Sequence, residues 1–290
     1  VGMVQGLMFI VTSVFSGLSV GLLGMGWTIV VALALTALAF LHVLTLRMPE
    51  EVRAAATDAR GGFDLGGSLA AVWAVSGLFA LILFSTFNNF IGGVYMALMD
   101  PYGLEMFSVE LWGTFLALGA TGFIAGGALV GKFGLGSNPL RTLLVAVAVM
   151  GAVGAVFTLR EWPLLYVAGI WLYLVLVPVV EAAEQTVIQR VVPLHRQGRV
   201  FGFAMAFESA AAPITAFLIA PIAQVWIIPY ARSPEGAAQL APLLGEGTSR
   251  GIALVFLISG IILIAAALLA FLTPVYRRVS ASYAQTDAGT

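Results

Sequence analysis

The chain has 290 residues, of which 61% are hydrophobic and only 9% are charged, with a formal net charge of -1 and no cysteine. A soluble domain carries roughly 25% charged residues, so this chain has too few to cover its surface in water, and its composition predicts an integral membrane protein. The lack of cysteine excludes disulfides and thiolate metal sites, and near-zero net charge excludes the electrostatic footprint of a nucleic-acid-binding protein. We expect no cofactor and no metal, because the only histidines are His42 and His195.

Membrane spans can be located as stretches free of Asp, Glu, Lys and Arg, since a crossing helix needs about 20 apolar residues. Such stretches are 1–46, 65–99, 111–131, 142–159, 162–180, 209–231 and 251–276. The first is long enough for two crossings at roughly 1.5 Å per residue, and its glycines between Gly21 and Gly26 offer the turn. The sequence therefore predicts an all-α polytopic protein with eight transmembrane helices.

Basic residues predict the orientation of these spans, because short cytoplasmic loops collect Lys and Arg. With eight crossings, only Arg160, Arg232 and Arg250 lie on one side. The other side carries Arg47, Arg53, Arg60, Lys132, Arg141, Arg190, Arg196, Arg199, Arg277 and Arg278. We therefore expect both chain ends to be cytoplasmic.

The chain is predicted to consist of two membrane units joined by a charged linker. Two spans in 1–46 precede a cytoplasmic linker over 47–68, six spans follow in 69–276, and 277–290 form a cytoplasmic tail. Six spans are a half-transporter unit of 3+3 inverted repeats, whereas two spans enclose no interior. Together with Val1 as the first residue, this asymmetry favours a fragment of a longer chain; an alternative initiation codon is the other interpretation.

Three carboxylates lie at membrane depth and are candidates for proton coupling. Glu181 and Glu184 are three residues apart, hence on one helix face, and Glu208 lies about 12 Å into the next span at helical rise. The two spans run antiparallel around a short loop, so the three side chains can meet. Intramembrane carboxylates are costly and commonly serve as proton relays. The alternative for Glu184 is an ion pair with Arg190 or Arg199 that fixes the loop.

The span over 69–98 carries the candidate substrate-binding residues. Asparagines in hydrocarbon need partners, and aromatic neighbours suit a mostly apolar pocket with a few polar orienting groups. An inter-helix hydrogen bond with aromatic packing is the structural alternative. The candidates are Phe84, Phe87, Asn88, Asn89 and Tyr95.

An enzyme is not expected, because the sequence has no G-x-S-x-G elbow, no paired histidine ligands and no P-loop. Without a P-loop, a transporter built from this chain uses an ion gradient or none. Pro213 and Pro221 lie in the Glu208 span, and interrupted helices line transporter cavities.

The end of the fourth span resembles the cytoplasmic-loop motif of the major facilitator superfamily, G-x-L-x-D-R-x-G-R. The sequence there is Gly-Ala-Leu-Val-Gly-Lys-Phe-Gly over 127–134. The matching positions are Gly127, Leu129, Lys132 (for Arg) and Gly134, while Gly131 replaces the Asp and Leu135 the final base. The position of this motif in the family implies that the spans here correspond to helices five to twelve of twelve, so that four helices are absent from this chain.

Other segments are similar to the drug:proton antiporter branch, which contains the macrolide-efflux and multidrug exporters. They are 181–185, 189–193, 198–202 and 251–256. The resemblance implies a multi-pass protein of a bacterial plasma (inner) membrane that exports amphipathic small molecules in exchange for protons. Its expected partners are substrate, protons, lipid and either the missing N-terminal helices or another chain. The alternatives are export of a siderophore or lipid-like metabolite, and a truncated remnant or scaffold that does not transport.

Overall fold

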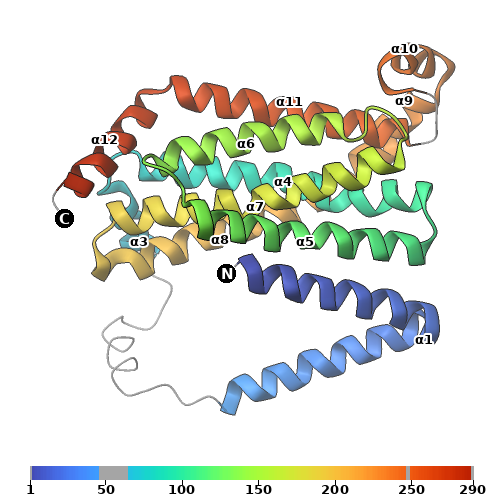
Figure 1. Ribbon diagram of the computed structural model, residues 1–290, viewed down its shortest axis with the longest axis horizontal. Helices are drawn as coiled ribbons and strands as arrows, with labels where there is room; N and C mark the ends of the chain where they lie inside the picture. The colour runs from blue at the N-terminus through green and yellow to red at the C-terminus, as the bar shows by residue number, and fades with distance from the viewer. Residues whose placement is uncertain (1, 46–64, 246–248, 289–290) are drawn as a thin grey trace.

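The computed structural model describes residues 2–45, 65–245 and 249–288, and the regular elements in these ranges are all helices (Figure 1). Seven of the described helices are long and apolar enough to cross a membrane. They are Gly24–Thr45, Leu78–Met106, Val109–Phe133, Pro139–Val156, Pro163–Val191, Arg196–Arg232 and Arg250–Leu272. The prediction of an all-α, multi-pass membrane protein is confirmed.

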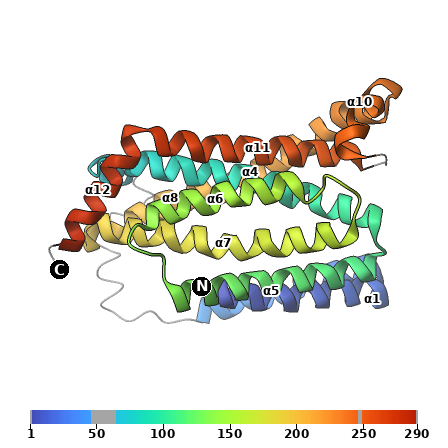
Figure 2. The ribbon, with the colours of Figure 1, turned by 45° about the horizontal axis from the view of Figure 1, so that its top comes forward.

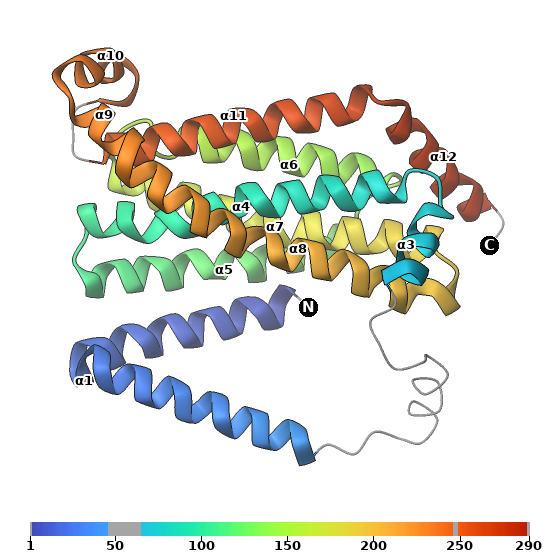
Figure 3. The ribbon, with the colours of Figure 1, turned by 180° about the vertical axis from the view of Figure 1, so that it is seen from behind.

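The N-terminal helix α1 (Gly2–Thr45) folds back on itself at Gly24, where φ is 80° and ψ is 164°. This positive φ is easily adopted only by glycine, and it lies inside the predicted turn. The two arms run in opposite directions, and α1 packs against α5 (Val109–Phe133) (Figure 3). The arm before Gly24 corresponds to the first of the eight predicted crossings; it is helical but is not one of the seven helices above.

The predicted span after the linker begins differently in the structure. Of the predicted linker, residues 47–64 lie outside the described residues, and the chain then forms α3 (Leu65–Trp73). The expected continuous span over 69–98 is interrupted before α4 (Leu78–Met106), because Gly77 at its N-terminus has φ 85°. The membrane helix therefore begins at Leu78.

The remaining long helices form a bundle whose packing has internal symmetry. They are α4, α5, α6 (Pro139–Val156), α7 (Pro163–Val191), α8 (Leu194–Ile222) and α11 (Arg250–Leu272). Helix α4 packs on α8, α5 on α7, α6 on both α11 and α7, and α11 also on α4. Exchanging α4, α5 and α6 for α7, α8 and α11 reproduces this set of contacts. Helices α4 and α7 enter the bundle from opposite ends (Figures 1 and 2), as in an inverted repeat.

Glycines let neighbouring helices of the bundle approach closely. A Cβ on Gly122 of α5 would lie 2.6 Å from the carbonyl oxygen of Trp171 on α7, and one on Gly126 would overlap the carbonyl oxygen of Val175. Between α6 and α11, a Cβ on Gly151 would lie 2.8 Å from the Gly260 oxygen. These small residues bring backbones together in a membrane, where packing drives helix association.

Four shorter elements complete the two ends of the bundle. Helix α8 runs through Pro213 and continues after Pro221 as a π-helical turn, η1 (Ala223–Ile227), and α9 (Ile228–Arg232), so the expected interruption is a local change of helix type. One end then carries α10 (Pro234–Leu244), and the opposite end carries α12 (Pro274–Ala288), which occupies most of the predicted tail (Figure 1).

The described basic residues separate between these ends as the sequence predicts. Arg160, Arg232 and Arg250 lie at the end that carries α10, here called the α10 end. The opposite end, here called the basic end, carries Lys132, Arg141, Arg190, Arg196, Arg199, Arg277 and Arg278. Arg47, Arg53 and Arg60 are outside the described residues.

Candidate functional site

A cavity of about 470 Å³ lies among α4, α7 and α8 and contains all three predicted carboxylates. We call it the acidic cavity and define it by Glu181, Glu184, Glu208, Asn88 and Asn89. Most of its remaining wall is apolar. These side chains include Met96, Phe123, Met150, Tyr173, Val177, Phe201 and Met205.

Two antiparallel helices position the carboxylates. Helix α7 places Glu181 and Glu184 one turn apart on the face that borders the cavity, and α8 returns from the Val192–Pro193 turn to bring Glu208 to the same space. Glu184 is 7% exposed, whereas Glu181 and Glu208 are half-buried. The structure thus brings the three predicted residues together, and their role in proton coupling stays a prediction.

The charges in this cavity are of one sign. Glu184 interacts electrostatically with Glu208 and Glu181, and the Ser85 hydroxyl lies beside it. Among the described residues that line the cavity there is no Lys, Arg or His. In the described part of the chain, Oε1 of Glu184 and Oε1 of Glu208 are buried without a hydrogen-bond partner. Buried polar atoms are normally hydrogen-bonded, so these oxygens are available to a proton, to water or to a ligand.

The predicted substrate-binding residues of α4 do not share one cavity. Asn88 and Asn89 line the acidic cavity, and the Asn89 amide donates a 3.0 Å hydrogen bond to the Ser85 carbonyl of the same helix. Phe84 and Phe87 line a different, apolar groove. The structure therefore leaves two of the five predicted residues beside the carboxylates.

The fifth predicted residue, Tyr95, lies in the core of the bundle. Its side chain is 4% exposed, and its hydroxyl donates a 3.1 Å hydrogen bond to the carbonyl oxygen of Phe256. Its ring stacks on that of Phe256, with 5.0 Å between centroids, and lies 5.1 Å from that of Tyr173. Tyr95 thus joins α4 to α11 and contacts Tyr173, a residue of the cavity wall.

The residues that match the cytoplasmic-loop motif, within 127–134, lie where α5 ends at the basic end of the bundle. Gly134 ends the helix with φ 68°, and Asn138 begins α6, its side chain accepting from the Arg141 amide at 3.0 Å. The Asn138 amide also donates to the Ser280 hydroxyl of α12 at 2.7 Å, so this connection is tied to the C-terminal helix. Of the motif positions, Gly127, Leu129 and Lys132 belong to the last turns of α5 and Gly134 follows them.

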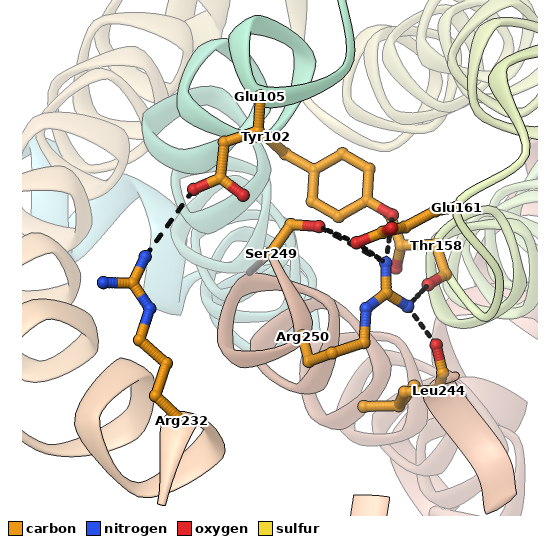
Figure 4. A network of polar contacts seen from close by, with 8 residues as sticks. All are labelled: Tyr102, Glu105, Thr158, Glu161, Arg232, Leu244, Ser249 and Arg250. Carbon is orange, nitrogen blue, oxygen red and sulfur yellow. Dashed lines mark hydrogen bonds and ion pairs between the residues drawn. The ribbon is translucent and has the colours of Figure 1, made fainter. Parts of the chain in front are cut away.

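The sequence analysis missed a polar network at the α10 end, centred on Arg250 (Figure 4). Arg250 is 3% exposed and forms an ion pair with Glu161, with 2.8 Å between Nη2 and Oε1. It also donates to the Tyr102 hydroxyl at 3.1 Å and to the carbonyl oxygen of Leu244. The Ser249 hydroxyl donates to the same Glu161 oxygen at 2.6 Å.

This network joins segments far apart in sequence: α4, the α6–α7 connection, the end of α10 and the start of α11. We call it the Arg250 network and define it by Tyr102, Glu161, Leu244, Ser249 and Arg250. Its one signal in the sequence is an arginine directly before an uninterrupted apolar span. An arginine at the start of a span is equally typical of the membrane surface, where its side chain faces water.

No metal centre is present among the residues that the structure describes, because no group of three His, Asp or Glu side chains is arranged to hold an ion.

Comparisons with protein-family models, with curated proteins and with solved structures find no match for this chain. What the site does must therefore be argued from its own residues.

Proposed function

We propose that this chain is a proton-coupled transporter of the major facilitator type that exports amphipathic small molecules. The observation that carries the proposal is the acidic cavity, where three intramembrane carboxylates without a lining cation meet. A charged carboxylate in the membrane costs several kcal/mol, and such residues commonly take part in ion or proton movement. Protonation of Glu184 or Glu208 removes both this cost and their mutual repulsion.

The shape and lining of the cavity suit the proposed substrate. Its volume of about 470 Å³ lies within the range of roughly 300 to 1,000 Å³ that is typical of small-molecule sites. Apolar and aromatic side chains form most of the wall, and Asn88 and Asn89 add polar groups that can orient a ligand. An amphipathic molecule can therefore bury its apolar part while its polar part meets the carboxylates.

The bundle offers a physical route for alternating access. Inverted repeats of this kind occur in transporters in which one repeat or bundle moves against another around a central site. In the proposed cycle, protonation of Glu208, assisted by Glu181 and Glu184, favours one access state, and release of the proton favours the other. A ligand or proton shifts such an equilibrium only by its difference in affinity for the two states.

Accumulation of a fluorescent lipophilic drug in cells expressing the chain tests this proposal, with and without a protonophore. Export that the protonophore abolishes is expected, and Glu208→Gln should lower it at least tenfold. The matched control is Glu235→Gln, which changes an exposed glutamate on α10 and should leave export unchanged. Inserted, folded protein without export would contradict the proposal, and export insensitive to the protonophore would contradict proton coupling.

We further propose that the basic end faces the cytoplasm of a bacterial cell. Because the chain has no cysteine, a single introduced thiol reports its own side of the membrane without background. Ser137→Cys, in the exposed loop before α6, should react with a membrane-impermeant maleimide only after the cells are opened. Glu235→Cys on α10 should react in intact cells, and the reverse pattern would overturn this orientation.

A further inference from the structure

An apolar groove of about 510 Å³ runs along the outside of the bundle at its basic end. It lies between α4, α6 and α11, and Tyr276 and Val279 of α12 line it at that end. We call it the lipid groove and define it by Phe84, Phe87, Leu144, Leu269 and Tyr276. It takes no part in the acidic cavity, because the two have no lining residue in common.

We propose that the lipid groove binds one anionic phospholipid, with an acyl chain in the groove and the phosphate at the arginines of the basic end. The inference does not depend on transport, only on the membrane spans. Leu83 and Leu269 on its two sides are 58% and 63% exposed. In a bilayer, these faces contact lipid chains.

The length of the groove matches one leaflet. Its lining along α4 extends from Gly77 to Phe87, roughly 15 Å at 1.5 Å per residue. A hydrocarbon core about 30 Å thick gives each leaflet about the same depth. An acyl chain that enters at the start of α4 would thus lie along the groove for its length while its head group remains at the surface.

Charge at the mouth of the groove favours an anionic head group over a zwitterionic one. Arg277 and Arg278 belong to the same turn of α12 as Tyr276 and Val279, which line the groove, and both are exposed. Arg141 is also exposed and directly follows Leu140, another lining residue. Basic pockets beside membrane helices on the cytoplasmic side recognise anionic lipid head groups.

Helix α12 is held in place to form this mouth. The Ser280 hydroxyl accepts the 2.7 Å hydrogen bond from Asn138, and the Arg190 guanidinium lies over the Tyr283 ring at 5.7 Å from its centroid. Val279 is only 3% exposed. The arginines of this turn are therefore presented from a packed helix.

Native mass spectrometry of the purified protein tests the head-group part of the proposal, with phosphatidylglycerol and phosphatidylcholine added in equal amounts. One phosphatidylglycerol should be retained in preference. Arg277→Gln with Arg278→Gln should weaken its binding about 30-fold, since each basic residue near an anionic surface contributes about a fivefold factor. The matched control, Arg196→Gln with Arg199→Gln, removes two exposed charges of α8 at the same end and should change binding less than threefold.

A second pair of variants tests the acyl-chain part. Leu269→Trp places a large ring at an exposed position of the groove and should lower retention of phosphatidylglycerol at least tenfold without unfolding the protein. Leu268→Trp, on the neighbouring exposed position outside the groove, should not. Equal retention of both lipids, equal loss in the control arginine pair, or full retention in Leu269→Trp would each overturn the proposal.

Discussion

Two polar regions of this protein differ in the partners that surround their charged groups. In the Arg250 network, a buried arginine meets a carboxylate, a hydroxyl and backbone carbonyls, and the ion pair with Glu161 is 2.8 Å long. In the acidic cavity, carboxylates face one another, and oxygens of Glu184 and Glu208 have no hydrogen-bond partner among the described residues. In one region a buried charge meets an opposite charge, and in the other carboxylates meet one another.

The difference separates a region that stabilises the fold from a region that can change its protonation state. A buried charge that is paired with an opposite charge makes its neighbours depend on it, since removal of one partner leaves the other uncompensated. Carboxylates that face one another without a cation stabilise little, but they can gain or lose a proton without breaking an ion pair. The Arg250 network therefore serves as structure at the α10 end, whereas the acidic cavity is suited to a change of state.

Glu161→Gln gives the largest expected effect, because it breaks the ion pair of a buried arginine. Loss of one partner in a buried pair costs about 3 to 5 kcal/mol. The side chain of Glu161 is 36% exposed, so water offsets part of the loss, and we expect a fall of about 3 kcal/mol in the free energy of unfolding. Titration with sodium dodecyl sulfate in mixed micelles measures it. A change below about 1 kcal/mol would contradict the assigned role.

Tyr102→Phe should have the next largest effect. The Tyr102 hydroxyl accepts from the Arg250 guanidinium at 3.1 Å, and hydrogen bonds to charged groups contribute about 1.5 to 3 kcal/mol. Tyr166→Phe is the matched control, because both side chains are fully buried and the Tyr166 hydroxyl donates to the neutral Met99 carbonyl. That control should cost about 1 kcal/mol. Equal losses would show that the charge on Arg250 contributes nothing to the contact.

The acidic cavity was partly accessible to prediction because its sequence signal is local. A glutamate stands out in an apolar span, and helical periodicity pairs Glu181 with Glu184. The short turn after α7 then brings Glu208 back at similar depth. These steps use only helix geometry and loop length, so they require no knowledge of the rest of the fold.

The Arg250 network was not accessible in this way, because its members come from distant parts of the sequence. Tyr102 and Arg250 are separated by 148 positions, and no local pattern links them. The substrate-binding set on α4 failed to share a cavity for a related reason. Each residue turns a helix by about 100°, so adjacent residues such as Phe87 and Asn88 face different neighbours even though they look like one cluster in the sequence.

Glu184→Gln should raise stability slightly, opposite in sign to the same exchange at Glu161. The amide keeps the shape of the side chain and carries no charge, so at a pH where Glu184 and Glu208 are both ionised it removes their repulsion, and we expect the free energy of unfolding to rise by up to about 1 kcal/mol. The same titration measures the change. A loss of more than about 1 kcal/mol would show that Glu184 is paired as Glu161 is, and the distinction between the two regions would fail.

Arg232→Gln should have the smallest effect, although it also breaks an ion pair beside the Arg250 network (Figure 4). The Arg232 and Glu105 side chains are 57% and 33% exposed, and their closest N and O atoms are 3.9 Å apart. Exposed pairs contribute about 0 to 1 kcal/mol and are screened by salt. We expect a loss below about 0.5 kcal/mol that disappears at high ionic strength, whereas the loss in Glu161→Gln should persist there because Arg250 is buried. If both variants lose similar stability and respond alike to salt, then burial is not what separates a structural charge from an incidental one in this protein.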